Sequence, residues 1–189
     1  MKKLAMIMGL MAIVCVAVAV TAQEDKPAGQ PAFEMGAPTQ MKQVAFMIGI
    51  WDVSMQYRMS PEAPWMEDDA VNTNNLILDG CVLESDFEGD MNGTPMKGIS
   101  MTTYNRGLGE WQTMWTDNFG MGISLYTGGF ADGKMVFAGE DVMPGGEKVR
   151  ARVTSYNISD TTYDWMMEMS NDDGQTWYTS MKATYTKRQ

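Results

Sequence analysis

The sequence predicts an all-β protein, an antiparallel up-and-down β-barrel of about ten strands preceded by a short helix. Three observations lead to this fold class. Hydrophobic and polar residues alternate with a period of two along most of the chain. Turn sequences such as Asn92-Gly93, Asp132-Gly133 and Asp173-Gly174 separate the alternating segments. No segment between these turns has the pattern of a crossover helix, so neighbouring strands are expected to run antiparallel.

The chain begins with a segment that resembles a secretory signal peptide. Lys2 and Lys3 precede an apolar run over residues 4–20, and Ala22 follows among small residues typical of a cleavage site. We therefore expect residues 1–22 to be removed and the mature protein to be periplasmic or secreted. The apolar run is too short to favour a membrane anchor, so no stable membrane span is expected after cleavage.

A disordered linker and a short helix are expected ahead of the strands. Residues 23–38 contain three prolines and two glycines, which is typical of a flexible tether. Thr39 is a candidate cap for a helix that runs to about Met47 and ends before Gly49. Such a helix could plug one end of the barrel that we expect over residues 39–189.

The first five strands carry the alternation most clearly. They are expected near residues 51–59, 69–78, 81–88, 96–104 and 110–117. The first strand places these residues on one face: Trp51, Val53, Met55, Tyr57 and Met59. The third repeats the pattern with Cys81, Leu83, Ser85 and Phe87. Each strand therefore has one apolar face for the interior and one polar face for solvent.

Five further strands follow at similar spacing, and they begin near residues 121, 135, 149, 165 and 177. Val149, Ala151 and Val153 share one face of the eighth strand. One face of the last strand is expected to carry Trp177, Thr179, Met181, Ala183 and Tyr185. A barrel of ten strands leaves interior space, whereas eight strands are nearly filled by their own side chains. A two-sheet sandwich is the alternative architecture that the pattern leaves open.

The charge of the chain limits its partners. The chain has 24 acidic and 14 basic residues, and removal of Lys2 and Lys3 would leave 12 basic residues and a net charge of −12. Such a domain repels nucleic acid, so no nucleic-acid partner is expected. The acidic residues are scattered, which is typical of a soluble surface. The oligomeric state is left open by the sequence.

The chain contains no histidine, and this absence excludes several mechanisms. A Ser-His-Asp triad, a histidine-ligated haem and a histidine-containing zinc site all require that residue. Cys81 is the one cysteine outside the apolar leader, so an internal disulfide is excluded as well. We expect Cys81 to be a small buried residue, and no cofactor is implied.

Several motifs along the chain occur together in a known family. They are Gly49-x-Trp51-Asp52, Gly80, Phe87-Glu88-Gly89, Gly98, Tyr104-Asn105, Trp111, Trp115-x-Asp117, Gly120, Glu168-x-Ser170, Asp173-Gly174 and Tyr185-Thr186-Lys187. In this order, from Met41 to Arg188, they resemble a bacterial family known as domain of unknown function 1579. The resemblance implies a lipocalin-like, or calycin, barrel. It brings no accepted activity and no catalytic residues. Related barrels that bind haem do so through histidine, so that function is not transferred.

Large inward-facing residues make the interior the candidate binding site. The candidate ligand-binding residues are Trp51, Met55, Phe87, Tyr104, Trp111, Trp115, Asp117, Trp165 and Trp177. Aromatic residues at strand spacing form a packed core in many proteins, and in a hollow barrel the same residues line the cavity. Asp117 or Tyr104 would supply a polar contact at the mouth. The sequence thus favours non-enzymatic binding of a small apolar or amphipathic molecule.

The chain is rich in methionine, with 21 residues, of which 17 follow the predicted signal peptide. The alternation places five of them inward: Met55, Met59, Met167, Met169 and Met181. Methionine can fill a core in place of leucine, or it can line a soft and adaptable pocket. Thioether ligation of Cu(I) is disfavoured because no Met-x-x-Met array and no neighbouring histidine accompany these residues.

Two other function classes stay open at this point. A structural or interaction protein would have a filled barrel and would use its outer faces. A carboxylate-dependent hydrolase would need two acids that face each other across a cleft. Asp117 is expected inward near the mouth and Glu168 is expected outward, so the sequence does not bring such a pair together.

Overall fold

The computed structural model describes residues 34–189, and Met35–Gln189 form one compact unit. The predicted signal peptide and residues 23–33 of the predicted linker lie outside the described residues.

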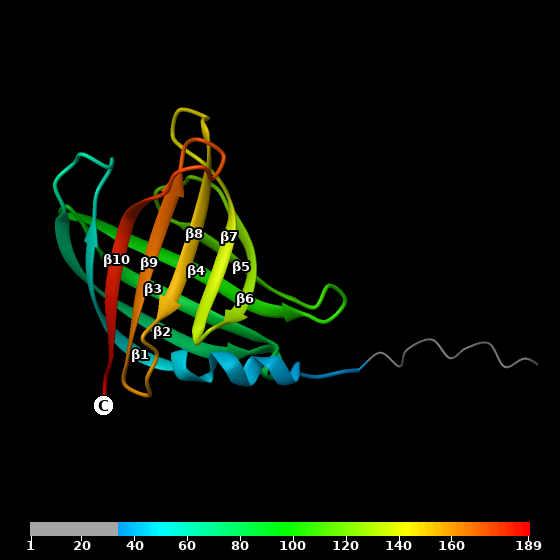
Figure 1. Cartoon of the computed structure of the whole chain (residues 1–189). Helices are drawn as coiled ribbons and strands as arrows, with labels where there is room; N and C mark the ends of the chain where they lie inside the picture. The colour runs from blue at the N-terminus through cyan, green and yellow to red at the C-terminus, as the bar shows by residue number, and fades with distance from the viewer. Residues whose placement is uncertain (1–33) are drawn as a thin grey trace, which may run out of the picture. The chain divides into compact units, whose positions relative to one another are not determined.

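The described chain forms a closed antiparallel barrel of ten strands in which each strand pairs with the next and β1 closes on β10 (Figure 1). The strands are β1 (Gly49–Tyr57), β2 (Met66–Ile77), β3 (Val82–Met91), β4 (Thr94–Asn105), β5 (Glu110–Asp117), β6 (Ser124–Ala131), β7 (Lys134–Val142), β8 (Lys148–Tyr156), β9 (Thr162–Ser170) and β10 (Tyr178–Lys187). The predicted fold class is confirmed, and the closed ring of paired strands excludes a two-sheet sandwich.

The two ends of the barrel differ. The 3₁₀ helix η1 (Thr39–Met47) lies across one end, which we call the closed end, together with the short helix η2 (Leu78–Gly80) (Figure 1). The other end, the open end, carries the turns that follow β1, β3, β5, β7 and β9. Since successive strands run in opposite directions, each strand joins the closed end to the open end.

Helix η1 is held by its buried side chains and by its last carbonyl. Met41 and Val44 are buried in a cluster with Leu83 and Trp111. The carbonyl of Met47 accepts hydrogen bonds from Trp51 Nε1 at 2.7 Å and from the side chain of Asn74, which satisfies an otherwise orphaned helix end. The predicted cap by Thr39 is not formed, because Pro38 occupies the N-cap position without a side-chain bond.

Three strand predictions are wrong in detail. β1 ends at Tyr57, so Met59 lies in the following turn and is 72% exposed instead of inward. β6 begins at Ser124, so the predicted strand start at Met121 is wrong. In β10 a register shift between Thr179 and Met181 interrupts the alternation that was expected to continue from Trp177.

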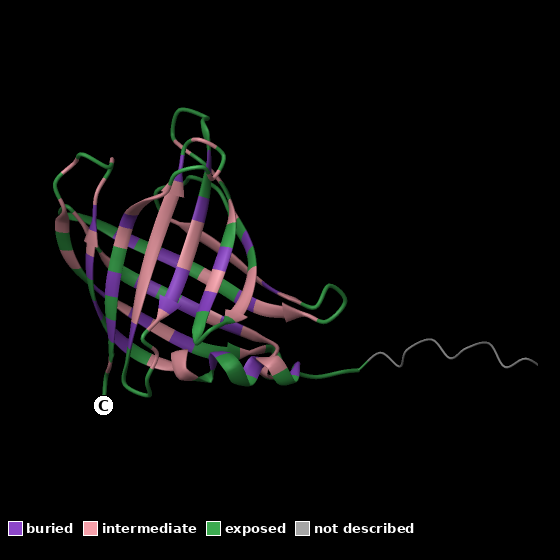
Figure 2. Cartoon of the chain, in the orientation of Figure 1, coloured by how far each residue is buried: buried purple, intermediate pink, exposed green. Residues whose placement is uncertain are grey.

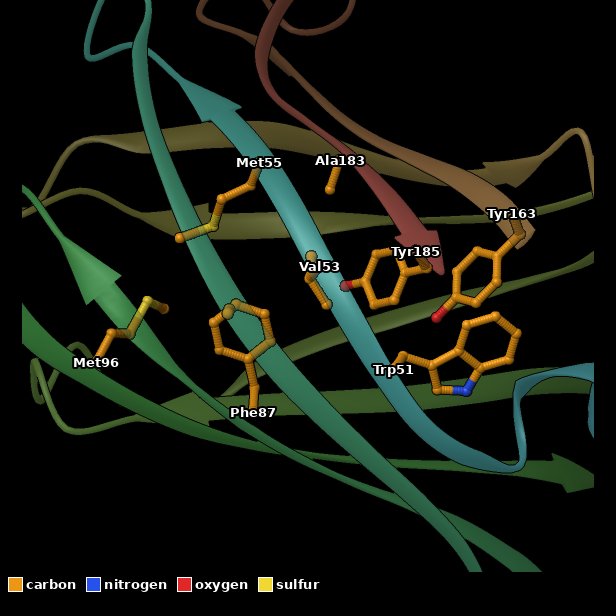
Figure 3. Packing of buried hydrophobic residues seen from close by; sticks show 9 residues of the cluster. Trp51, Val53, Met55, Phe87, Met96, Tyr163, Ala183 and Tyr185 are labelled. Atoms are coloured by element: carbon orange, nitrogen blue, oxygen red, sulfur yellow. The ribbon is translucent and has the colours of Figure 1, made fainter. Parts of the chain in front are cut away.

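Aromatic residues dominate the core at the closed end. Tyr163 stacks on Tyr185 with ring centroids 4.3 Å apart, and the Trp51 ring meets Tyr163 edge to face (Figure 3). Figure 2 shows buried residues alternating with exposed ones along the strands, as the sequence pattern predicts. The predicted burial of Cys81 is only partly met, because this free cysteine is half-buried just before β3.

Candidate ligand-binding lumen

Inward-facing side chains are packed at the closed end and partly exposed toward the open end. At the closed end Trp51, Trp111, Met135 and Tyr163 are each at most 2% exposed. Toward the open end some inward positions, such as Met55, Met96 and Ala151, are buried as well, but others are only half-buried. These half-buried positions form the open-end lumen, defined here as Ser100, Thr113, Trp115, Val153, Trp165, Met167, Met169 and Met181. These side chains are therefore less completely covered than those at the closed end.

A glycine on β4 lets the largest side chain of the lumen lie against the wall. A Cβ atom on Gly98 would lie 2.2 Å from Cη2 of Trp115, so the indole occupies the space that a side chain would fill. Trp115 Nε1 donates to Asp117 Oδ2 at 3.0 Å, which fixes the orientation of the ring. The ring also meets Phe87 edge to face. Trp115 is thus held flat on the wall instead of crossing the lumen.

The same arrangement recurs on β6 and β7. A Cβ atom on Gly139 would lie 2.6 Å from Cδ1 of Tyr126. The Tyr126 hydroxyl donates to Asp141 Oδ2 at 2.5 Å. Burial, and then the hydrogen bond to Asp141, raise the pKa of Tyr126 far above its ordinary value, so it remains a neutral donor. Two aromatic rings are therefore set against glycine backbone and anchored by carboxylates.

A third aspartate at the open end also accepts from an aromatic residue. Tyr57 donates its hydroxyl proton to Asp68 at 2.7 Å, and the backbone N–H of Asn92 donates to the same carboxylate at 2.9 Å. The Asn92 N–H and then the Tyr57 hydroxyl lower the pKa of Asp68. Asp68, Asp117 and Asp141 give the open end a negative potential, which disfavours the entry of anions.

The interior has a polar side and an apolar side. Strands β2 to β5 present hydrogen-bonding side chains to it, namely Asn72, Asn74, Ser85, Ser100, Thr102 and Thr113. Of these, Thr102 and Thr113 bond each other at 2.8 Å. Strands β8 to β10 present Val153, Trp165, Met167, Met169, Met181 and Ala183. A molecule in this lumen would meet hydrogen-bonding groups together with the rings of Phe87 and Trp115 on one side, and flexible apolar groups on the other.

The structure sorts the predicted site residues by depth. Trp115, Trp165 and Asp117 lie at half-buried inward positions toward the open end. Met55 and Phe87 are buried in the cluster on which Trp115 and Trp165 pack. Trp51 and Trp111 are sealed in the closed end, where Trp111 Nε1 donates to Gln43. The first three are therefore partly accessible wall residues. Trp51, Met55 and Phe87 belong to the cluster on which Trp115 and Trp165 pack, and Trp111 belongs to a second cluster.

Two predicted site residues are placed elsewhere. Tyr104 was expected at the mouth with Asp117, but it pairs with Trp111 at the closed end of the same hairpin. Trp177 was expected inward, but it lies before β10 on the outer surface, where the Arg152 guanidinium is 4.5 Å from its ring centroid. The interrupted alternation of β10 explains the second error.

Ser100, Thr113 and Val153 belong to the open-end lumen and were not among the predicted site residues. They are small residues at inward positions, and their alternation with outward residues was already visible in the sequence. Gly98 and Gly139 were missed as well, because their role appears only when the register places Trp115 and Tyr126 beside them.

The structure brings no catalytic pair together from Asp117 and Glu168. Asp117 faces inward, whereas Glu168 faces outward as predicted and pairs with Arg152 at 2.8 Å. Within residues 34–189 there is no group of three histidine, cysteine, aspartate or glutamate residues that could hold a metal ion. The same part of the chain contains no helix of the length and apolarity needed to cross a membrane.

Two grooves lie on the barrel wall, apart from the open-end lumen. One, of about 570 Å³, lies over β2 to β5 and includes Val71, Thr73, Lys97, Ile99 and Thr116. The other, of about 400 Å³, lies between Ala138, Arg150 and Trp177. Both are lined mainly by outward-facing residues, and the first also includes the inward residues Phe87, Gly98 and Asp117.

Comparisons with known proteins identify the family and support the fold. The family model described as "Protein of unknown function (DUF1579)" matches residues 38–187. The crystal structure of Rv2717c from M. tuberculosis is similar, with a TM-score of 0.57, 11% identity and coverage of 81% of this chain and 99% of that chain. The S-type phycobiliprotein lyase CPES from Guillardia theta has a TM-score of 0.54, 10% identity and coverage of 78% and 92%. The comparison with curated proteins gives no significant match.

The chain therefore belongs to the DUF1579 family, since the family model spans nearly the whole described domain. The two solved structures support the barrel fold alone, because their sequence identities are low.

Proposed function

We propose that this barrel binds a small apolar or amphipathic molecule in its open-end lumen, without catalysing a reaction, outside the cytoplasm. The observation that carries the proposal is the placement of Trp115 against Gly98. An inward ring of this size would fill the centre of a barrel if it projected from the wall. Trp115 and the neighbouring inward residues Ser100 and Thr113 stay half-buried, which supports a lumen that admits a ligand.

The lining of the lumen supports a ligand with two unlike sides. Met167, Met169 and Met181 lie on neighbouring strands and are unbranched and polarizable, so they adapt to different ligand shapes. Across the interior Ser100 and Thr113 offer hydroxyl groups. We expect a molecule that is largely apolar with a few hydrogen-bonding groups. The negative open end disfavours ligands that carry several negative charges.

Interaction with another protein is the second candidate function, and the outer surface gives the observation that favours it. The groove of about 570 Å³ over β2 to β5 includes Ile99, which is 40% exposed. Near it on β6, Leu125 is 68% exposed. An exposed apolar surface of this kind can bind a partner while the interior plays no part.

Native mass spectrometry of the mature protein, purified from its own compartment, tests the proposal. We expect a reproducible added mass that is lost on denaturation. The matched pair of variants is Val153→Trp, which fills the lumen, and Val142→Trp, which adds the same ring at an exposed outward position. The added mass should disappear only in Val153→Trp.

A bare chain mass in the wild type, or an added mass that Val153→Trp retains, would contradict the proposal. An added mass lost only in a variant of the outer groove, such as Ile99→Glu, would favour the second candidate.

A further inference from the structure

Two buried amide oxygens face the interior without a hydrogen-bond partner. Asn72 and Asn74 occupy consecutive inward positions on β2 and are 6% and 0% exposed. Within the described chain, the Oδ1 atoms of both residues are buried and accept no hydrogen bond. Buried polar atoms are nearly always paired, because an unpaired acceptor loses its water without compensation. These two oxygens therefore need an explanation.

Three donors close to the amides are already engaged or insufficient. Asn74 Nδ2 and Trp51 Nε1 both donate to the carbonyl of Met47. The amides of Asn72 and Asn74 face the hydroxyl of Tyr163, and their hydrogen bonding partly opposes the rise in the Tyr163 pKa that burial causes. One phenolic proton cannot satisfy two amide oxygens. None of these donors bonds to either amide oxygen, so both oxygens stay unpaired.

The charges around the two amides indicate what kind of donor would fit. The inward aspartates Asp68, Asp117 and Asp141 all lie toward the open end, whereas the Lys187 ammonium lies at the closed end, 5.3 Å from the ring centroid of Trp51. A buried cation beside Asn72 would therefore lack a counter-ion, and an anion would meet two acceptor oxygens. A neutral O–H or N–H group matches the two oxygens without either penalty.

We propose that the inner end of the lumen binds the neutral hydroxyl or amide head group of an amphipathic ligand through Asn72 and Asn74. This inference rests on the proposed function and adds the chemical class and the orientation of the ligand. The head group enters first, and the apolar chain extends past Trp165 and Met167 toward the open end. Trp51 and Phe87, which pair with Asn72, belong to a packed cluster that includes Met55 and has Met47 against it, and these two methionines have flexible, unbranched side chains.

Two isomeric probes test the inference directly. 1-Nonanol donates and accepts a hydrogen bond, whereas 1-methoxyoctane has the same atoms and only accepts. Their affinities are measured by displacement of the fluorescent probe N-phenyl-1-naphthylamine from the mature protein. We expect 1-nonanol to bind about fivefold more tightly than 1-methoxyoctane, as one or two hydrogen bonds to the amides would give. Nonanoate should bind more weakly than 1-nonanol.

The variant Asn72→Leu should bring the ratio of the two affinities close to one while the affinity for 1-methoxyoctane stays within about twofold. Asn72→Val serves if the leucine variant does not fold. The matched control is Asn75→Leu, the same change at an exposed outward position of β2, and it should keep the wild-type ratio.

Each failure has a distinct meaning. Equal affinities of the two isomers in the wild type would overturn this inference and leave the proposed function standing. If Asn72→Leu keeps the wild-type ratio of the 1-nonanol and 1-methoxyoctane affinities, the inference is overturned too. The hydroxyl of 1-nonanol would then be bound elsewhere, or a water molecule would satisfy the amides. If neither the isomers nor N-phenyl-1-naphthylamine bind, the proposed function falls and the inference with it.

Discussion

The closed and open ends of this barrel are built from the same strands with the same alternation, yet one is a packed core and the other a lumen. At the closed end, η1 covers the interior and aromatic rings project into it, with Trp51 and Tyr163 in edge-to-face contact. Toward the open end the large ring of Trp115 lies against Gly98 and stays half-buried. The difference shows that the direction of a side chain does not decide whether it is core or cavity wall. Whether an inward side chain becomes core or cavity wall depends on the residue beside it on the neighbouring strand and on whether a helix such as η1 covers that end.

The largest expected effect is the loss of an aromatic ring at the closed end. Trp51→Ala should lower the free energy of unfolding by about 3–5 kcal/mol, because Trp51 is fully buried and its removal leaves a cavity in the packed core. Trp165→Ala, the matched change at a half-buried lumen position, should cost clearly less. Urea denaturation followed by circular dichroism measures both values. Equal losses would mean that the two ends are packed alike.

Methionine provides a second matched pair with a smaller effect. Met135→Ala at the closed end should cost about 2–5 kcal/mol, since this side chain is 2% exposed within a packed cluster. Met169→Ala in the lumen should cost about 1 kcal/mol or less, because the side chain already borders solvent. The same denaturation experiment applies, and a Met169 variant as unstable as the Met135 variant would argue for a filled lumen.

The glycine behind Trp115 gives the third test. In Gly98→Ala the new methyl group would overlap the indole, so the ring must leave the wall or the strands must shift. We expect a loss of about 1–3 kcal/mol, typical of overpacking, together with weaker binding of N-phenyl-1-naphthylamine. Gly145→Ala is the control, because no atom lies within 4 Å of the added Cβ. Unchanged stability and probe binding in Gly98→Ala would remove the basis for the open lumen.

Acidic pH should act on one turn of the open end. Asp172 accepts from the Thr176 hydroxyl and backbone N–H and from Ser170, and these bonds lower its pKa from 3.8 to about 2. A lowered folded-state pKa contributes stability that is present above about pH 4 and is lost as the pH falls toward 2. Asp172→Asn should therefore flatten this part of the stability profile. A profile identical to that of the wild type would show that the turn does not contribute.

The sequence predicted the barrel because strand alternation and turn residues are local properties, and these fixed the inward positions of Trp115, Asp117 and Met167. The position of Tyr104 could also have been predicted from the sequence. Tyr104 lies beside the turn of the β4–β5 hairpin, whereas Asp117 lies at the far end of β5, so the two residues must be at opposite ends of the barrel. The outward position of Trp177 could not be predicted, because the sequence carries no clear signal for the irregularity in β10 that reverses the alternation before Met181.

The division of the interior into core and lumen could not be predicted from the sequence. It depends on the register that sets Gly98 beside Trp115, and on the contacts by which Met41 and Val44 of η1 cover only one end. Both are long-range features. The orphaned amides of Asn72 and Asn74 likewise become visible only when burial and every nearby donor are known.

Methionine oxidation measures the difference between the two ends most directly, because the chain carries this residue in each environment. Dilute hydrogen peroxide is applied to the folded protein, and peptide mass spectrometry follows each site. Exposed Met59 should react fastest, Met167, Met169 and Met181 at intermediate rates, and buried Met55 and Met135 slowest. N-Phenyl-1-naphthylamine should protect the three lumen methionines and leave Met59 unchanged. Lumen methionines that react as slowly as Met135 would contradict the account.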